Sequence, residues 1–295
     1  MGGVAIIGAG RMGGAIWRRL HDQDVDAIVV DASGDATAAL AAEGATIAAD
    51  PASLAGRAGV VLLSLPTSAE VEEVALGTRG LASAMAPGTL VVDLTSGLPS
   101  ASRRIAGRLA DAGVRYIDVG VSGGVEGARA GTLKAMIGGA EEDVRAARHV
   151  LELIVTRSWH CGAVGAGHLV KTLLNQSNQA KLMVELEALL VAARAGLDPV
   201  IVADVLDASV WSYWLFDPSG RRTVGFALSL ACKDFDIALQ TATETRVAVP
   251  LAAMAQQMAR LALADAGSDA DLIDAVAVWE RLAGVKLVPT EGGAS

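Results

Sequence analysis

The chain has 295 residues, of which 52% are hydrophobic and 19% charged, and these values indicate a soluble globular protein large enough for two ordinary domains. Its formal net charge of −9 disfavours a nucleic-acid partner, because the phosphates would be repelled. No apolar run reaches the roughly 18–20 residues of a membrane span, and the N-terminus lacks a signal-peptide pattern. A cytoplasmic location without membrane association is therefore expected.

Short β-type runs alternate with helical runs through the first half of the chain. These β-type runs cover residues 4–10, 26–31, 45–49, 59–66, 89–96 and 115–122, with 132–139 and 155–162 as later additions. Residues 60–63 are apolar at every position, as expected when helices cover both faces of a parallel sheet. The alternation predicts a Rossmann-type, doubly wound α/β sheet.

The second half has the composition of helices. From His168 to about Ala195 there is no proline or glycine, which predicts one helix of about 40 Å. Further helices are expected at residues 198–209, 223–246, 250–265 and 271–284. The sequence thus predicts an α/β domain over residues 1–162 and an all-α C-terminal domain over 163–295, joined through the long interdomain helix. Residues 288–295 are expected to form a disordered tail.

A glycine-rich motif follows the first expected strand and opens a helix. In "GAGRMG", Gly8, Gly10 and Gly13 have the G-x-G-x-x-G spacing of a dinucleotide-binding turn, which brings the helix N-terminus to a pyrophosphate. Arg11 and Met12 lie inside the motif and are expected to contact the same cofactor. The alternative is a purely structural turn, but the strand and helix on either side favour dinucleotide binding.

An acidic residue stands where such a domain needs one. Asp31 ends the second long strand, 18 residues after Gly13, where a carboxylate can bind the adenosine ribose hydroxyls. A 2′-phosphate would be repelled by Asp31, and the neutral Ala32 and Ser33 follow it instead of an arginine. The sequence therefore favours NAD over NADP.

Two further polar segments follow buried strands, at the edge of the sheet where ligands bind in open α/β folds. We expect "LPT", which is Leu65, Pro66 and Thr67, to line the cofactor cleft. Thr95 and Ser96 are expected near the nicotinamide ribose. Ordinary turn chemistry is the alternative explanation for both segments.

Lys171 is anomalous because apolar pairs at 169–170 and 173–174 flank it on the long helix. Asn175 follows one helical turn later on the same face. A lysine in this setting can extend along apolar surface to solvent or pair with a nearby acid. The glycines at 165 and 167 clear space one turn earlier, and with Asn175 on the same face they make these two alternatives less favoured.

At this point the chain resembles a known family, the β-hydroxyacid dehydrogenases, which include 3-hydroxyisobutyrate dehydrogenase and tartronate semialdehyde reductase. The resemblance covers nearly the whole chain and rests on five motifs in order: "GAGRMGGAIWRRL", "LSLPTSAEVEEV", "DVGVSGGVEGARAGTLKAMIGG", "GAGHLVKTLLN" and "KDFDIAL". By this resemblance Lys171 is the general acid/base. A lysine held in an apolar cleft beside the positive nicotinamide loses its proton more readily, which suits that role.

The resemblance also implies a substrate site. Ser122, Gly123 and Gly124 match the family's substrate loop, in which successive backbone N–H groups bind a carboxylate. Asn175 matches the asparagine that binds substrate, although Leu174 replaces the polar residue that often precedes it.

Other implied contacts lie in the helical domain. Lys233 matches the lysine that closes over the cofactor, and Trp211, Ser212 and Trp214 lie in a segment that lines the substrate pocket. Core packing is the alternative for the two tryptophans. The four histidines lack metal-ligand spacing, so no metal is expected.

The resemblance implies NAD-dependent oxidation of a small β-hydroxy acid to its semialdehyde or oxo acid, or the reverse reduction, by a homodimer or homotetramer. Three alternatives stay open: oxidative decarboxylation of the 6-phosphogluconate type, imine reduction, and NAD binding without catalysis. Lys171, Asn175 and Ser122 together argue against the last, because a non-catalytic protein has no need of them.

Overall fold

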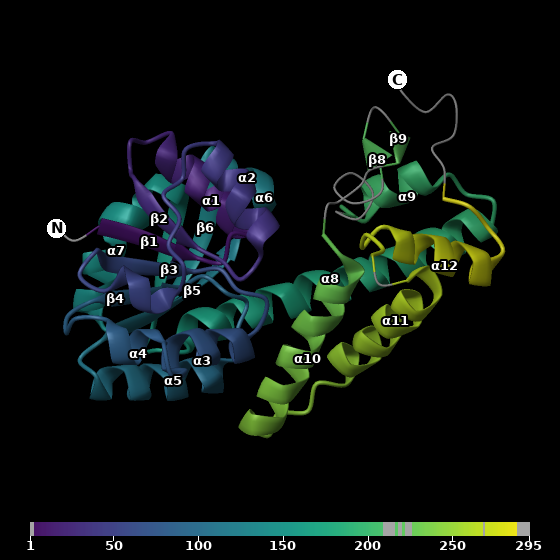
Figure 1. Cartoon of the computed structure of the whole chain (residues 1–295). Helices are drawn as coiled ribbons and strands as arrows, with labels where there is room; N and C mark the ends of the chain where they lie inside the picture. The colour runs from purple at the N-terminus through teal and green to yellow at the C-terminus, as the bar shows by residue number, and fades with distance from the viewer. Residues whose placement is uncertain (1–2, 209–215, 218–219, 222–225, 268, 288–295) are drawn as a thin grey trace. The chain divides into compact units, whose positions relative to one another are not determined.

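The computed structural model describes residues 3–208, 216–217, 220–221, 226–267 and 269–287 of the chain. It divides into two compact units, Met1–Lys171 and Thr172–Ser295, and each is described here by itself. Figure 1 shows strands and helices mixed in the first unit and mostly helices in the second.

The first unit is built on a seven-stranded sheet with the order β2-β1-β3-β4-β5-β6-β7. All neighbouring strands run parallel except β5 and β6, which are antiparallel. The strands are β1 (Gly3–Ile7), β2 (Ala27–Val30), β3 (Ala58–Leu63), β4 (Leu90–Asp93), β5 (Arg115–Ser122), β6 (Leu133–Gly138) and β7 (Val155–Gly162). The order runs outward in both directions from β1 and β3, which is the arrangement of a doubly wound sheet.

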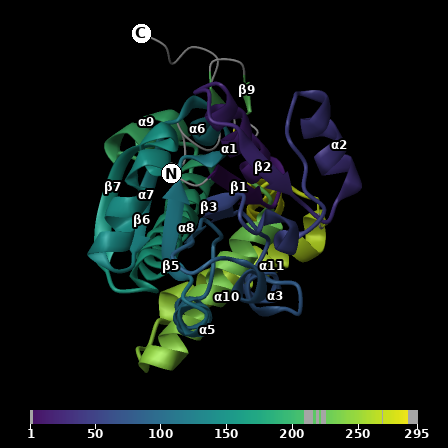
Figure 2. The same ribbon diagram turned by 60° about the vertical axis from the view of Figure 1, so that its left-hand side comes forward.

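Helices cover both faces of this sheet. One set contains α1 (Arg11–His21), α6 (Gly124–Ala130) and α7 (Glu141–Ile154), which contact one another. A second set contains α3 (Ser68–Leu76), α4 (Leu81–Ala84) and α5 (Pro99–Asp111), which also contact one another. In Figure 2, α6 and α7 lie beside β6, as their packing contacts require. The helix α2 (Gly34–Ala42) follows β2, and the 3-10 turn η1 (Pro51–Leu54) precedes β3.

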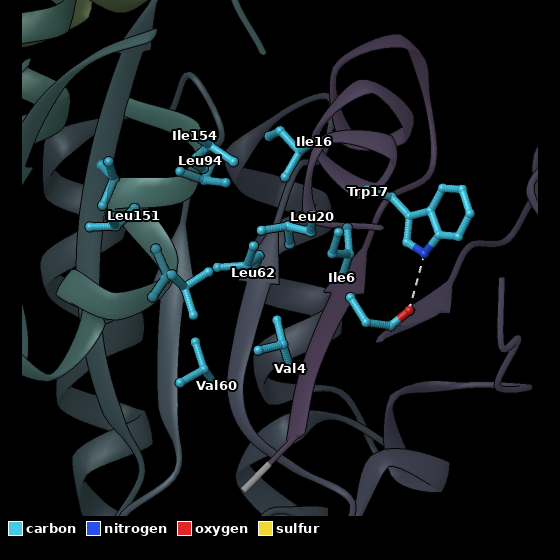
Figure 3. Close-up of a cluster of buried hydrophobic side chains, with 14 of the residues drawn as sticks. Val4, Ile6, Ile16, Trp17, Leu20, Val60, Leu62, Leu94, Leu151 and Ile154 are labelled. Carbon is cyan, nitrogen blue, oxygen red and sulfur yellow. Dashed lines mark hydrogen bonds between the residues drawn. The ribbon is translucent and has the colours of Figure 1, made fainter. Parts of the chain in front are cut away.

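Each strand supplies side chains to two cores because alternate residues point to opposite faces. Val4 and Ile6 of β1 pack with Ile16 and Leu20 of α1, as Figure 3 shows. Their neighbours in β1 belong to the second core, under α3 and α5. The indole N–H of Trp17 donates to the carbonyl of Ala27 at 3.2 Å and so ties α1 to β2.

The second unit is mostly helical. The long helix α8 (Ala166–Arg194) begins in the first unit, and α9 (Pro199–Val205), α10 (Leu228–Thr245), α11 (Pro250–Ala266) and α12 (Asp274–Ala283) follow it. α10 packs against α11, and α11 against α12. Apolar residues of α8 and α12 form one core with Ala203 of α9. The strands β8 (Phe216–Asp217) and β9 (Gly220–Arg221) form a short antiparallel pair.

The predicted fold class is confirmed, and α8 matches the long helix expected at 168–195. The pair β8–β9 is an addition that the all-helical expectation lacked. Residues 45–49 form only an isolated bridge, between Ile47 and Val29, instead of a strand. The expected tail at 288–295 lies outside the described residues. None of the helices in the described part of the chain has the length and hydropathy that crossing a bilayer requires.

Candidate active site

The turn after β1 needs glycine at two positions for packing reasons. Gly8 has a φ of 100°, and a Cβ there would lie 2.2 Å from the carbonyl oxygen of Ser64. A Cβ on Gly13 would lie 1.8 Å from the carbonyl oxygen of Gly8. These two glycines therefore allow α1 to pack directly against the turn and β3.

Gly10 is different because nothing in the protein lies within 4 Å of the position its Cβ would take. It is the N-cap residue of α1, and no side chain caps this helix start. The N–H groups of the first turn of α1 are the donor set that a pyrophosphate needs, and Gly10 leaves space beside them. Arg11 beside it is exposed, whereas Met12 is half-buried against the core.

Asp31 lies against this turn. Its carboxylate accepts short hydrogen bonds from the backbone N–H groups of Ala9 and Ser33. The end of β2 is thereby held beside the end of β1, as the dinucleotide-binding interpretation requires.

The segments after β3 and β4 are joined by hydrogen bonds. The backbone N–H of Leu65 donates to Oγ1 of Thr95 at 3.1 Å, and the N–H of Thr95 donates to a carboxylate oxygen of Asp93 at 3.0 Å. Thr67 caps the start of α3 through the N–H of Ala69. Pro66 and Ser96 stand in the same two turns, Pro66 exposed and Ser96 half-buried. All these groups lie at the carboxyl edge of the parallel strands.

The start of α8 is bound by a carboxylate from the sheet. Asp118 in β5 is fully buried, and its two oxygens accept from the N–H of Gly165 at 2.6 Å and of His168 at 2.7 Å. Burial raises the pKa of Asp118, and these backbone hydrogen bonds oppose that rise. The helix N-terminus is thus capped by a residue some fifty positions earlier in the chain.

The side chain of His168 makes a second attachment. Nε2 donates to the carbonyl of Asp93 at 3.2 Å, which leaves Nδ1 to accept from the Ser102 hydroxyl at 2.8 Å. Tyr116 donates to the Asp93 carboxylate at 2.6 Å, and burial, with the Asp93 charge, raises its pKa. His168 is 1% exposed, so it holds α8 against β4 and α5.

Lys171 lies one turn further along α8, directly over β5. A Cβ on Gly120 would lie 2.4 Å from Cβ of Lys171, and a Cβ on Gly167 would lie 2.6 Å from the carbonyl oxygen of Asp118. The two glycines therefore let the first turns of α8 touch the sheet. Since residues two apart in a strand share a face, Ser122 projects to the same side as Gly120. Lys171 and Ser122 therefore lie on the same face of β5.

Gly123 and Gly124 follow Ser122 with φ values of 136° and 67°. Gly123 is the N-cap of α6, so the segment leads directly from strand into helix. These positive φ values turn the backbone sharply beside Ser122, where glycine is strongly preferred.

The remaining predicted residues belong to the second unit. The Asn175 side-chain nitrogen donates to the Asp234 carboxylate at 2.6 Å. Lys233, which precedes Asp234 in the chain, is half-buried. Trp211, Ser212 and Trp214 lie outside the described residues. Among the residues that the structure describes, no group of histidines, cysteines and acids could hold a metal ion.

Sequence reasoning missed two of these contacts. It treated Asp118 as part of a motif without a role, although an acid inside a buried strand run is itself a signal. It gave Asn175 no protein partner, whereas the carboxylate of Asp234 on another helix accepts a hydrogen bond from its side chain.

The chain matches two family models. Residues 3–165 match the NAD binding domain of 6-phosphogluconate dehydrogenase, and residues 165–279 match the NAD-binding domain of NADP-dependent 3-hydroxyisobutyrate dehydrogenase. The chain is 32% identical to 2-(hydroxymethyl)glutarate dehydrogenase of Eubacterium barkeri, with 96% of this chain and 97% of the relative covered. It is 33% identical to 3-hydroxyisobutyrate dehydrogenase of Pseudomonas aeruginosa, with coverages of 89% and 93%.

A solved structure agrees with this. Mycobacterium tuberculosis 3-hydroxyisobutyrate dehydrogenase, solved with L-serine, has a TM-score of 0.85 at 28% identity and covers 95% of this chain and 99% of its own. Fold and sequence are therefore shared over almost the full length of the relatives. The chain belongs to the β-hydroxyacid dehydrogenase family, whose members are NAD(P)-binding oxidoreductases that act on a CH–OH group.

Proposed function

We propose that the protein oxidises a small β-hydroxy acid to its semialdehyde with NAD⁺, or catalyses the reverse reduction, and that Lys171 is the general acid/base. One observation carries the proposal. Lys171 is packed onto β5 beside Ser122, at the carboxyl edge where the glycine turn and Thr95 also lie. Open α/β sheets bind cofactor and substrate at this edge.

Each residue then has a defined task. NAD⁺, when bound, supplies the acceptor for the hydride that leaves the substrate carbon. Lys171 takes the hydroxyl proton in its neutral form and returns it as an ammonium in the reverse direction. Ser122 and the backbone N–H groups of Gly123 and Gly124 bind the carboxylate. Asn175 orients the substrate through its carbonyl oxygen, since its amide nitrogen already donates to Asp234.

The cofactor has its own residues in the proposal. Gly8, Gly10 and Gly13 shape the phosphate site, with Arg11 and Met12 beside it and Asp31 on the ribose. The nicotinamide half is lined by Leu65, Pro66, Thr67, Thr95 and Ser96, and Lys233 contributes from the helical unit. Trp211, Ser212 and Trp214 are proposed to contact the substrate side group. In this proposal residues 1–162 act as the NAD-binding domain and 163–295 as the substrate and dimerisation domain.

Three alternatives were left open by the sequence: decarboxylation of the 6-phosphogluconate type, imine reduction and NAD binding without catalysis. A panel of three- to six-carbon hydroxy acids, 6-phosphogluconate and a cyclic imine, assayed with both nucleotides, separates them. We expect turnover with acids that carry a hydroxymethyl group next to the carboxylate-bearing carbon.

Lys171→Ala tests the central role. The loss of a general acid/base should lower kcat by about 10²–10⁴-fold, while NADH binding changes little. Absorbance of the reduced cofactor measures the first quantity and fluorescence titration the second. Lys181→Arg, on the same helix and exposed, keeps a cation beside the buried Glu185 and is the control that should keep full activity. A Lys171→Ala protein within tenfold of wild type would refute the assignment.

Asp31→Ala tests the preference for NAD. We propose NAD because the carboxylate at the end of β2 can accept from ribose hydroxyls and repels a 2′-phosphate. Removing it should shift the ratio of kcat/KM for NAD to kcat/KM for NADP downward by roughly tenfold, the scale of one hydrogen bond to a charged group. An unchanged ratio would show that another residue reads the ribose.

Gly10→Ala and Gly13→Ala form a matched pair. A methyl group at Gly10 meets open space in the protein, so the melting temperature should stay near wild type while the Kd for NADH rises. The same methyl at Gly13 overlaps the Gly8 carbonyl and should destabilise the fold by roughly 1–3 kcal/mol. Thermal melts and fluorescence titrations of both variants separate the effects. Tight NADH binding by Gly10→Ala would contradict the phosphate site.

We propose a homodimer or homotetramer that buries apolar residues of the helical unit. Leu197 just before α9, and Ile201 and Val205 one turn apart within α9, are 58%, 64% and 78% exposed. Ile201→Glu combined with Val205→Glu should lower the mass measured by light scattering, whereas Ile47→Glu in the first unit should not. A wild-type protein that is monomeric at micromolar concentration would contradict this proposal.

A further inference from the structure

The register of the sheet places two cations in line with Ser122. Ser122 of β5 is paired with Lys134 of β6 in the antiparallel ladder, and Lys134 is paired with Arg157 of β7 in the parallel one. Directly paired residues project to the same side of a sheet. Ser122, Lys134 and Arg157 therefore form one row, which we call the cationic row.

The cationic row faces the side on which Lys171 lies. Gly120, two residues before Ser122, is the glycine against which Lys171 packs. The residues on either side of Lys134 in β6 are Leu133 and Ala135. Their side chains point to the opposite face, into the core beneath α1 and α7. Both observations give the same orientation, so the row and the general acid/base share a face of the sheet.

The two cations are exposed and make no ion pair in the described part of the chain. Arg157 instead lies over the ring of Trp159, with its Cζ 4.6 Å from the ring centroid. Other arginines of this acidic protein do find carboxylates, such as Arg18 with Glu43 and Arg104 with Glu72. The cationic row is thus a local positive site on a chain of net charge −9.

From this geometry we propose that Lys134, with Arg157 next to it, binds a second acidic group on the substrate. The preferred substrate is then a β-hydroxy acid whose side group ends in a carboxylate or a similar anion. This inference rests on the proposed function, because it places the first carboxylate at Ser122. The backbones of Ser122 and Lys134 are about 5 Å apart, and the Lys134 side chain extends beyond that, so a two- or three-carbon side group bridges the gap.

Charge and position both support this assignment. A cation beside the substrate carboxylate site attracts dianions from solution, and the acidic remainder of the protein would otherwise repel them. Since the row is exposed, each contact contributes modestly, and its effect should fall as salt screens it.

Two probes differ only in the side group. 2-(Hydroxymethyl)glutarate and 3-hydroxyisobutyrate share the hydroxymethyl group and the adjacent carboxylate, but the first carries a propionate where the second carries a methyl group. We expect wild type to prefer the dianion. Lys134→Gln and Arg157→Gln should each raise KM for 2-(hydroxymethyl)glutarate by roughly threefold, and the double variant by roughly tenfold, with kcat nearly constant. KM for 3-hydroxyisobutyrate should not change.

The control is the double variant Arg145→Gln, Arg148→Gln. Both residues lie on α7, which covers the opposite face of the sheet, and the variant loses the same net charge as Lys134→Gln with Arg157→Gln. This protein should match wild type on both substrates. Equal KM values for the two probes in wild type, or an equal rise on both in the Lys134 variants, would overturn the inference and leave the proposed function standing.

A binding measurement makes the test independent of turnover. 2-Methylglutarate and isobutyrate lack the reacting hydroxyl, and calorimetry in the presence of NADH should show tighter binding of the first, lost in the double variant. If neither hydroxy acid is oxidised but this difference appears, the proposed function fails and the dianion site stands. If calorimetry shows no difference, the dianion site is wrong.

Discussion

The arrangement of the first unit depends on one buried carboxylate. Asp118 joins the middle of β5 to the start of α8, where it accepts from the N–H groups of Gly165 and His168. A helix start that lacked these acceptors would leave buried donors unpaired, at a cost of about 1–3 kcal/mol each. The position of Lys171 over the sheet follows from where α8 begins. The Asp118 carboxylate that caps the helix therefore also fixes where the lysine lies over β5.

The same strand then serves three purposes on one face. Asp118 holds the helix, Gly120 gives it room, and Ser122 ends the strand beside the lysine. The other face of β5 carries Ile117 and Val119, which belong to the core under α1 and α7. Stability and chemistry are thus divided between the two faces of a single strand, and a change on one face need not disturb the other.

The sequence was sufficient for features that depend on local pattern. The glycine turn, the long helix and the alternation of strands and helices were all predictable, because periodicity and turn residues act over a few positions. Gly8 and Gly13 stand where the motif requires close packing. The apolar residues around Lys171 marked it as unusual, and the family resemblance implied its role and that of Ser122. The strand pairing and the packing of Gly120 show that both lie on one face of β5.

Contacts between distant segments were not predictable in this way. The pairing of Ser122 with Lys134 depends on the register of β5 and β6, and that of Asn175 with Asp234 on how two helices pack. No local signal separated Lys134 from other surface lysines. The short helix α6 at 124–130 was not predicted, because its glycines obscure the helical pattern.

The two-residue period of β5 also restricts how this enzyme can change over evolutionary time. One extra residue between Asp118 and Ser122 would turn the serine towards the core and a valine towards the lysine. A change in ligand specificity along β5 must therefore arise by exchanging side chains at fixed backbone positions. Insertions are confined to segments beyond the ends of the strand.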